Sequence, residues 1–168
     1  MSIIIEGTNG SGKSSLIEKL LIDLPEYISR KESKPPYDGF NYYLDTALNS
    51  NSANKIIFDR FHLGESVYPA IKTMENRKPL DAVQQHTIER ALLSRGSVLI
   101  FAETDEESII EVFRTRGEDY ILESEVKQEL GLFNEVYERS ILPKIKYDYR
   151  DPASYEKVLD FITNNHTI

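Results

Sequence analysis

The chain has 168 residues, 40% of them hydrophobic and 29% charged, which fits a single globular domain over residues 1–168. It contains no cysteine, so disulfides, thiolate catalysis and cysteine-ligated zinc are excluded. The formal net charge of −8 argues against binding to bulk duplex nucleic acid, although a few focused cations can still bind a small anion. No apolar run approaches the roughly 18 residues of a membrane span, and no signal peptide is evident, so we predict a cytoplasmic protein without membrane contact.

The first predicted elements are a strand, a glycine-rich turn and a helix. Ile3–Ile5 is a β-branched run that indicates a buried strand. From Lys13 to Leu24 the apolar residues recur at the spacing of an amphipathic helix. A second strand over 26–31, a proline-rich loop over 33–39 and a helix over about 40–48 follow.

Strands and helices continue to alternate to the end of the chain. After a polar turn at 49–54, strands are predicted at 55–59, 97–102 and 145–149. Helical patterns lie between these strands and after the last one. The helical stretch that follows residue 59 is divided into two helices at 76–79. Thr104 with Glu107 predicts a capping box, and Asp151-Pro152 predicts the start of the last helix. This alternation predicts an α/β fold with a parallel sheet covered by helices on both faces.

The turn after the first strand has the G-x-x-x-x-G-K-[ST] spacing of a phosphate-binding loop, or P-loop. Its glycines let backbone N–H groups surround a phosphate, and the following helix adds the partial positive charge of its N-terminus. Lys13 is expected to bridge the β- and γ-phosphates of a nucleoside triphosphate, and Ser14 to bind Mg²⁺. The predicted nucleotide-binding residues are Gly7, Asn9, Gly10, Ser11, Gly12, Lys13, Ser14 and Ser15.

Asp59 and Arg60 follow the third strand, at the edge where ligands of open α/β sheets bind. A carboxylate there can hold Mg²⁺ or accept a hydroxyl proton, and an arginine can bind an acceptor phosphate with two hydrogen bonds. Glu103 follows the fourth strand and can organise water on Mg²⁺ or, equally well, cap the next helix. The predicted magnesium residues are Ser14, Asp59 and Glu103.

Two arginines and several aromatic side chains complete the predicted site. Arg114 and Arg116, with Gly117 after them, predict a lid over about 114–122 that brings a cation to the transferring phosphoryl group, although basic residues also favour a helix end. The aromatic residues can either stack on a base or belong to the core. The predicted catalytic residues are Lys13, Asp59, Arg60, Arg114 and Arg116, and the predicted acceptor-binding residues are Asn9, Arg60, Phe61, Tyr68 and Tyr43.

These motifs together resemble the thymidylate kinase family, within the wider set of P-loop deoxynucleoside and nucleoside monophosphate kinases. Ile5-Glu6-Gly7 opens the chain as in that family, and Asp59-Arg60-Phe61 with Tyr68 is similar to its D-R-[YF]-x-x-S-x-x-A-Y motif. Arg77–Asp81 falls at a basic turn of the family, and Arg114–Glu118 resembles its arginine-bearing lid. The resemblance covers most of the chain.

The resemblance implies a five-stranded parallel sheet of order 2-3-1-4-5, ATP and Mg²⁺ as cofactors, and a homodimer. It places Arg60 on the acceptor phosphate and the lid arginines on the donor. Asn9 stands where the family usually has a carboxylate near the acceptor sugar, and Pro69 stands where it has a glutamine near the base. The base and the sugar of the acceptor are therefore left open.

The sequence predicts ATP- and Mg²⁺-dependent phosphoryl transfer to a nucleotide, and a (deoxy)nucleoside monophosphate such as dTMP or a 5-substituted dUMP is the first choice. One alternative is a kinase of a hydroxyl group, on a deoxynucleoside or on a modified base that is free or in DNA, with Asp59 as the candidate base. A second alternative is a non-catalytic module that binds ATP as a switch.

Overall fold

The computed structural model describes residues 1–32, 35–36, 38–49, 55–72, 77–117 and 121–165. The polar turn predicted at 49–54, the helix break at 76–79 and the lid at 114–122 lie partly outside these ranges. The strands are β1 (Ser2–Glu6), β2 (Tyr27–Lys31), β3 (Lys55–Asp59), β4 (Val98–Ala102) and β5 (Lys144–Tyr147). The helices are α1 (Lys13–Asp23), α2 (Gly39–Asn49), α3 (Leu63–Ile71), α4 (Ala82–Leu93), α5 (Glu106–Arg116), α6 (Val126–Arg139) and α7 (Ser154–Asn165), with a 3₁₀ turn at Glu123–Glu125.

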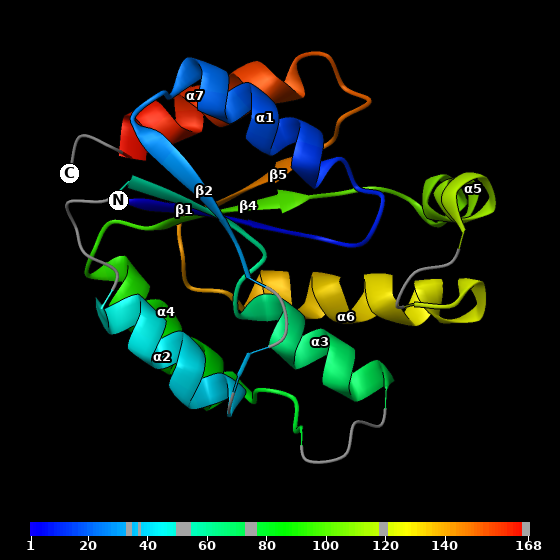
Figure 1. The fold of residues 1–168 in the computed structure, drawn as a ribbon, viewed down its shortest axis with the longest axis horizontal. Helices are drawn as coiled ribbons and strands as arrows, with labels where there is room; N and C mark the ends of the chain where they lie inside the picture. The colour runs from blue at the N-terminus through cyan, green and yellow to red at the C-terminus, as the bar shows by residue number, and fades with distance from the viewer. Residues whose placement is uncertain (33–34, 37, 50–54, 73–76, 118–120, 166–168) are drawn as a thin grey trace.

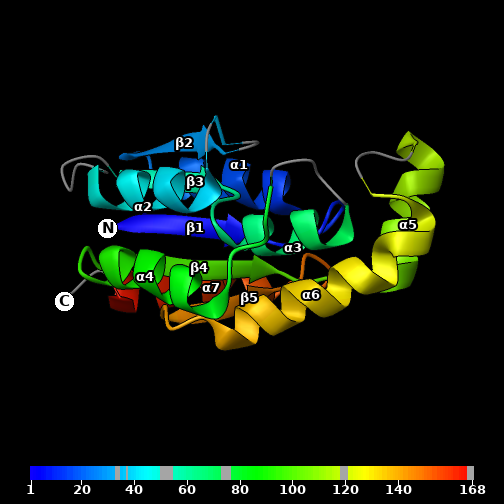
Figure 2. The same ribbon diagram turned by 90° about the horizontal axis from the view of Figure 1, so that it is seen from below.

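The five strands form one parallel sheet in the order β2-β3-β1-β4-β5, as expected. Helices α1 and α7 cover one face of the sheet, and α2, α3, α4 and α6 cover the other (Figure 1). Helix α5 lies beyond the carboxyl ends of the strands, next to the turn that follows β1 (Figures 1 and 2). This three-layer arrangement confirms the predicted fold class and brings the ends of β1, β3 and β4 to one edge.

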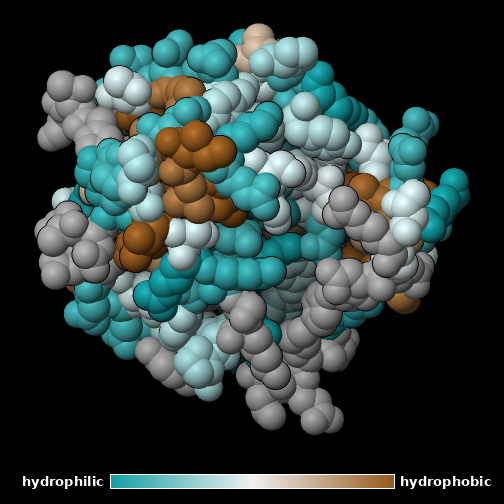
Figure 3. All heavy atoms as spheres, turned by 45° about the horizontal axis from the view of Figure 1, so that its top comes forward, coloured by the Kyte–Doolittle hydropathy of each residue, from teal (hydrophilic) through white to brown (hydrophobic). Residues whose placement is uncertain are grey.

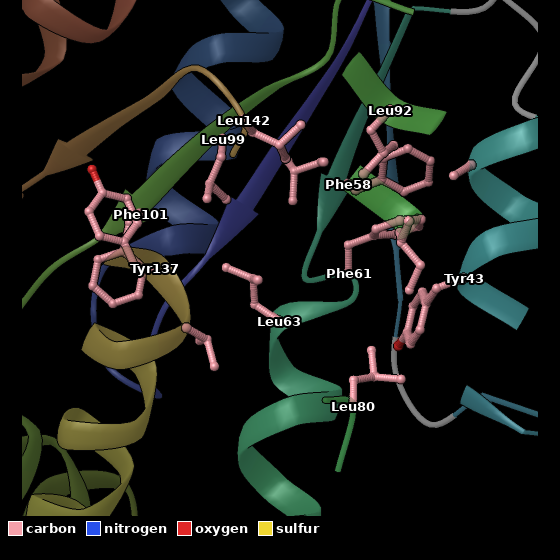
Figure 4. Packing of buried hydrophobic residues seen from close by; sticks show 14 of the residues in the cluster. Tyr43, Phe58, Phe61, Leu63, Leu80, Leu92, Leu99, Phe101, Tyr137 and Leu142 are labelled. Atoms are coloured by element: carbon pink, nitrogen blue, oxygen red, sulfur yellow. The ribbon is translucent and has the colours of Figure 1, made fainter. Parts of the chain in front are cut away.

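Each face of the sheet packs into its own hydrophobic core. Alternate strand residues point to opposite faces, so Ile4 contributes to the core under α2, α3, α4 and α6, while Ile3 and Ile5 contribute to the core under α1 and α7. Figure 4 shows the first of these cores, in which Phe58 and Phe101 from two strands meet side chains of the surrounding helices. The central strands β1 and β4 are buried along their whole length, as their apolar runs predict.

Two helices, α5 and α7, begin differently from the sequence prediction. Asp105, not Thr104, caps α5: its carboxylate accepts the backbone N–H three residues later at 2.8 Å, and the Thr104 side chain is buried. Asp151 instead forms a tight turn by accepting the N–H of Ala153 at 2.9 Å, so α7 begins at Ser154 rather than next to Pro152. In both places a short-range carboxylate bond decides where the helix begins.

On the face of the molecule that Figure 3 shows, the exposed hydrophobic residues lie in separate small groups. Ile22 and Ile28 are the most exposed large apolar residues of α1 and β2, at 77% and 58%. Single exposed apolar side chains are normal for a folded chain. Among the described residues, no helix is both long enough and apolar enough to span a bilayer.

Candidate functional site

The turn between β1 and α1 has the backbone of a phosphate cradle. Gly7, Gly10 and Gly12 all have positive φ angles, which residues with a side chain rarely adopt. A Cβ atom on Gly7 would lie 2.3 Å from the carbonyl oxygen of Ala102, so the loop also approaches β4 too closely for any other residue. The glycine pattern therefore has a steric cause at each position.

The Lys13 side chain is buried and lies across this turn. Its ammonium group donates hydrogen bonds to the carbonyl oxygens of Gly7, at 2.9 Å, and Thr8. Burial, together with the charge of Arg60, lowers the pKa of Lys13 to about 7, although nearby carboxylates oppose this shift. The ammonium group thus relies on weak neutral partners, and a phosphate would give it much stronger ones.

The N-terminus of α1 is open to an anion. Gly12 is the N-cap residue and provides no side-chain hydrogen bond, so the first backbone N–H groups of the helix are left for a ligand. Ser14 and Ser15 are exposed there, which leaves the Ser14 hydroxyl available to a metal ion. The Ser11 hydroxyl, in contrast, is buried and donates to the carbonyl oxygen of Thr8 at 2.8 Å, so its bond stabilises the loop itself.

Arg60 is held in a strained backbone conformation at the end of β3. Its φ angle of 66° is the only positive value for a non-glycine residue in the described part of the chain. A left-handed residue with a side chain costs on the order of 1–2 kcal/mol and persists only where its surroundings fix it. The Arg60 N–H donates to the carbonyl oxygen of Ile5 at 2.9 Å, which continues the contact with β1 past the end of the strand pair.

The Arg60 guanidinium lies between the P-loop and two helices. One nitrogen donates to the side-chain oxygen of Asn9, and another donates to the Tyr68 hydroxyl at 2.5 Å. Tyr68 in turn donates to Glu129 of α6 at 3.1 Å, and the backbone of Asn9 also hydrogen-bonds to Glu129. Burial raises the pKa of the Glu129 carboxyl. Residues from four parts of the chain thus form one polar cluster, which we call the arginine cluster: Asn9, Arg60, Tyr68 and Glu129.

Two of the predicted acceptor-binding aromatic residues belong to the core. Phe61 and Tyr43 are 1% and 2% exposed, and their rings pack edge to face with centroids 4.9 Å apart. Figure 4 shows both among the apolar side chains beneath the sheet. Of the predicted aromatic set, Tyr68 is the residue whose polar end joins the arginine cluster.

The predicted carboxylates stand at the ends of the two strands that flank β1, but they differ in their surroundings. Asp59 ends β3 opposite Ile5 of β1, so it lies beside the P-loop strand. Glu103 follows β4 and forms an ion pair with Lys146 at 2.8 Å, and its side chain is 41% exposed. Contact of either residue with Mg²⁺ stays a prediction.

The predicted lid is described in part. Arg114 is 70% exposed and lies 3.3 Å from the Glu123 carboxylate. Arg116 ends α5, but its side chain lies outside the described part of the structure, as do residues 118–120. Val112 lies so close to Gly10 that a Cβ atom there would be 3.2 Å from it, which places α5 directly against the P-loop.

Three buried carboxylates near the site were missed by the sequence analysis. Glu6 and Glu129 are fully buried, and Glu32, just past β2, is 5% exposed. Glu32 lies beside Asp59, because its N–H donates to the Asp59 carbonyl oxygen at 2.9 Å, and its carboxylate accepts from the Tyr42 hydroxyl at 2.6 Å. Glu129 had a detectable signal, since it lies four residues before Phe133 on the apolar face of α6.

No family model matches the sequence, and the search of curated proteins finds no match. Solved structures do share its fold. The YorR protein of Bacillus subtilis, in complex with phosphorylated GDP, has a TM-score of 0.81 at 22% identity, and the match covers 100% of this chain and 99% of that one. The deoxyadenosine kinase of M. mycoides with bound dCTP has a TM-score of 0.65 at 21% identity, with 98% and 100% covered.

The thymidylate kinase of Candida albicans has a TM-score of 0.51 at 17% identity, with 98% of this chain and 92% of that chain covered. Identities of this size show the fold alone. The chain therefore has the fold of P-loop nucleotide and deoxynucleoside kinases, as the sequence motifs led us to expect.

Proposed function

We propose that this protein transfers the γ-phosphoryl group of ATP to the phosphate of a (deoxy)nucleoside monophosphate such as dTMP or a 5-substituted dUMP. The observation that carries the proposal is a pair of cations beside the P-loop: the buried Lys13 at the start of α1 and the half-buried Arg60 at the end of β3. They lie close enough that the charge of Arg60 contributes to lowering the pKa of Lys13. Among the described residues, the hydrogen-bond partners of both cations are neutral groups, and such a pair fits a site for two phosphate groups.

The proposed reaction needs positioning and charge neutralisation more than covalent chemistry. The P-loop N–H groups and Lys13 hold the donor phosphates, while Arg60 holds the acceptor phosphate with its two outer nitrogens. An acceptor phosphate oxygen attacks the γ-phosphorus, the bond to the β-phosphate oxygen breaks, and ADP leaves. The exposed Ser14 hydroxyl and Asp59 fit a Mg²⁺ ion, which when bound neutralises phosphate charge. Arg114 and Arg116 of the proposed lid over 114–122 add positive charge on the donor side.

The fold neighbours support this proposal. The nucleotides that their structures hold, phosphorylated GDP in YorR and dCTP in the deoxyadenosine kinase, are small phosphorylated ligands of the class we propose here. The homodimer implied by the family resemblance belongs to the same proposal, and light scattering on the purified protein tests it.

One observation favours a hydroxyl acceptor as the second candidate. Glu32 and Asp59 bring two carboxylate residues to the ends of the adjacent strands β2 and β3, where the Glu32 N–H donates to the Asp59 carbonyl oxygen. A carboxylate within reach of a hydroxyl can accept its proton as the oxygen attacks phosphorus. A deoxynucleoside or a hydroxylated base, free or in DNA, would then replace the monophosphate.

ADP release from Mg·ATP, measured with a panel of acceptors, tests the proposal. The panel contains deoxynucleoside monophosphates, ribonucleotides, nucleosides and DNA with modified bases. Turnover that depends on a monophosphate supports the first candidate, and turnover only with nucleosides or DNA supports the second. Binding of ATP without turnover for any acceptor would leave only a non-catalytic nucleotide-binding module.

A further inference from the structure

Glu6 is a buried carboxylate whose position has a specific consequence for Arg60. It ends β1 immediately before the P-loop, and its side chain is 0% exposed. One carboxylate oxygen accepts hydrogen bonds from the backbone N–H groups of Phe61, at 2.8 Å, and Leu63, at 3.0 Å. Within the described residues, the other oxygen is buried without a hydrogen-bond partner. Burying a charged group in this way is costly, so a local structural benefit must offset it.

The two N–H groups that bind Glu6 belong to the turn that carries Arg60. The chain leaves β3 at Asp59, passes through the left-handed residue Arg60 and starts α3 at Leu63. The N-cap residue of α3, His62, makes no side-chain capping bond, so Glu6 caps this helix from a neighbouring strand. Figure 4 shows that the side chains of Phe61 and Leu63 are at the same time anchored in the apolar core.

We propose that Glu6 is a positioning residue for Arg60: by binding the N–H groups of Phe61 and Leu63, it fixes the left-handed turn that directs the guanidinium toward Asn9 and the acceptor. The proposal rests on the proposed function for the identity of the group that Arg60 binds. The effect of Glu6 on the turn that carries Arg60 follows from these hydrogen bonds, whatever group Arg60 binds.

The charge of Glu6 supports the same role. Burial favours the neutral form of Arg60, yet the pKa of Arg60 is raised, because Tyr68 and Glu6 more than compensate for the loss of water. Glu6 also opposes the lowering of the Lys13 pKa. Glu6 therefore acts on both cations through its charge, and on Arg60 also through the hydrogen bonds to its backbone turn.

Two variants of similar shape separate the hydrogen bonds from the packing. Glu6→Gln keeps a side-chain oxygen that can accept both N–H groups, whereas Glu6→Met fills the same volume and accepts neither. Both variants remove the charge of Glu6, so we expect Glu6→Met to have an acceptor KM at least about threefold above that of Glu6→Gln and about tenfold above that of the wild type, while the ATP Kd values of the two variants differ by less than about twofold. Glu6→Gln should restore the acceptor KM to within about threefold of the wild-type value.

Crystal structures of both variants give a readout that does not depend on activity. In Glu6→Met the backbone at residue 60 should leave the left-handed region and the contact between Arg60 and Asn9 should be lost, and in Glu6→Gln both should remain. An unchanged Arg60 in Glu6→Met would overturn the proposal, as would an equal loss of acceptor and ATP affinity. If Glu6→Met does not fold, Glu6→Asp provides the same test, because it draws the carboxylate back by one methylene group.

The two proposals fail in different ways. Absence of phosphoryl transfer by the wild-type protein, with a displaced Arg60 in Glu6→Met, would overturn the proposed function and leave Glu6 as the residue that positions Arg60. Wild-type turnover with Arg60 in place in Glu6→Met would overturn the inference about Glu6 and leave the proposed function standing.

Discussion

The P-loop and the arginine cluster lie side by side but are built in different ways. The P-loop is one contiguous segment whose shape comes from glycines with positive φ angles and from the start of α1. In the arginine cluster, Asn9 and Arg60 are 51 residues apart, and Tyr68 and Glu129 are 61 residues apart. The donor half of the site is thus a property of local backbone, whereas the acceptor half is a property of tertiary packing.

This difference extends to how the two cations are held before a ligand binds. Lys13 has neutral carbonyl groups as its hydrogen-bond partners, and burial lowers its pKa to about 7. Arg60 is held by side chains and by a strained backbone, and its pKa is raised despite burial. We expect the donor side to depend on the ligand for its charge balance, and the acceptor side to be preorganised.

Replacement of Lys13 should have the largest effect on activity. We expect Lys13→Met to lower kcat/KM by roughly a thousandfold, because a cation that neutralises developing phosphate charge is removed. The melting temperature should stay the same or rise, since the native state no longer buries this ammonium group. The matched control is Lys19→Met on the exposed side of α1, which should keep full activity. An equal loss in both variants would contradict a specific role for Lys13.

Replacement of Arg60 should act on the acceptor side alone. Arg60→Ala should raise the acceptor KM by about a hundredfold and leave the ATP Kd nearly unchanged, as measured by steady-state kinetics and calorimetry. Because glycine adopts φ near 66° without strain, Arg60→Gly should be more stable than Arg60→Ala by about 1 kcal/mol in urea unfolding. Equal stability of the two variants would show that residue 60 is not left-handed in solution.

The buried hydrogen bonds of Glu89 should make stability depend on acid pH. Glu89 is buried and accepts hydrogen bonds from His62 at 3.1 Å, from Gln85 at 3.0 Å and from the N–H of Ile141 at 2.8 Å. Burial alone would raise its pKa, but these bonds lower the pKa to about 2. The ionised carboxylate therefore stabilises the native state fully above about pH 4.5, and this contribution is lost as the pH falls toward 2.

We expect Glu89→Gln to be less stable than the wild type by about 2 kcal/mol at pH 6, with the difference shrinking between pH 4.5 and pH 2. Denaturant unfolding at several pH values measures this difference. Because other carboxylates titrate equally in both proteins, only the difference between the two curves reports on Glu89. A difference that stays constant over this range would contradict the assigned pKa shift.

The smallest effect is expected from removal of one hydroxyl group in the arginine cluster. Tyr68→Phe deletes the link between Arg60 and Glu129 and keeps the packing of the ring against Phe133. Loss of about 1 kcal/mol of hydrogen bonding should raise the acceptor KM about fivefold and leave kcat nearly unchanged. A fivefold change in the ATP Kd as well would contradict this expectation, because it would show that acceptor binding and ATP binding are energetically coupled through Tyr68.

Much of the fold was predictable because it rests on local patterns. The apolar run before Gly7 predicted β1, and the G-x-x-x-x-G-K-[ST] spacing predicted the strand–loop–helix unit that the structure contains. The capping residue of α5 was not predictable in the same way, because Thr104 and Asp105 both have capping side chains, and burial of Thr104 in the tertiary structure decides between them.

For the site, the sequence marked Lys13, Arg60 and Asn9 through motifs but could not assign their partners. Phe61 and Tyr43 were suitable for stacking on a base or, more commonly at such spacings, for the core, and the tertiary structure buries both in one core cluster. Glu6 stood in the Ile5-Glu6-Gly7 motif but could not be given a role, since a carboxylate after an apolar strand is usually at the surface.

The sequence by itself determined the order of strands and helices and the backbone of the phosphate cradle, because φ preferences and apolar spacing act between neighbouring residues. Only the tertiary structure decided which charges meet, because the sheet order places β3 beside β1 and so brings Arg60 against Asn9 and its turn against Glu6. The left-handed conformation of Arg60 is the clearest case: no local preference favours it, and contacts from distant parts of the chain hold it in place.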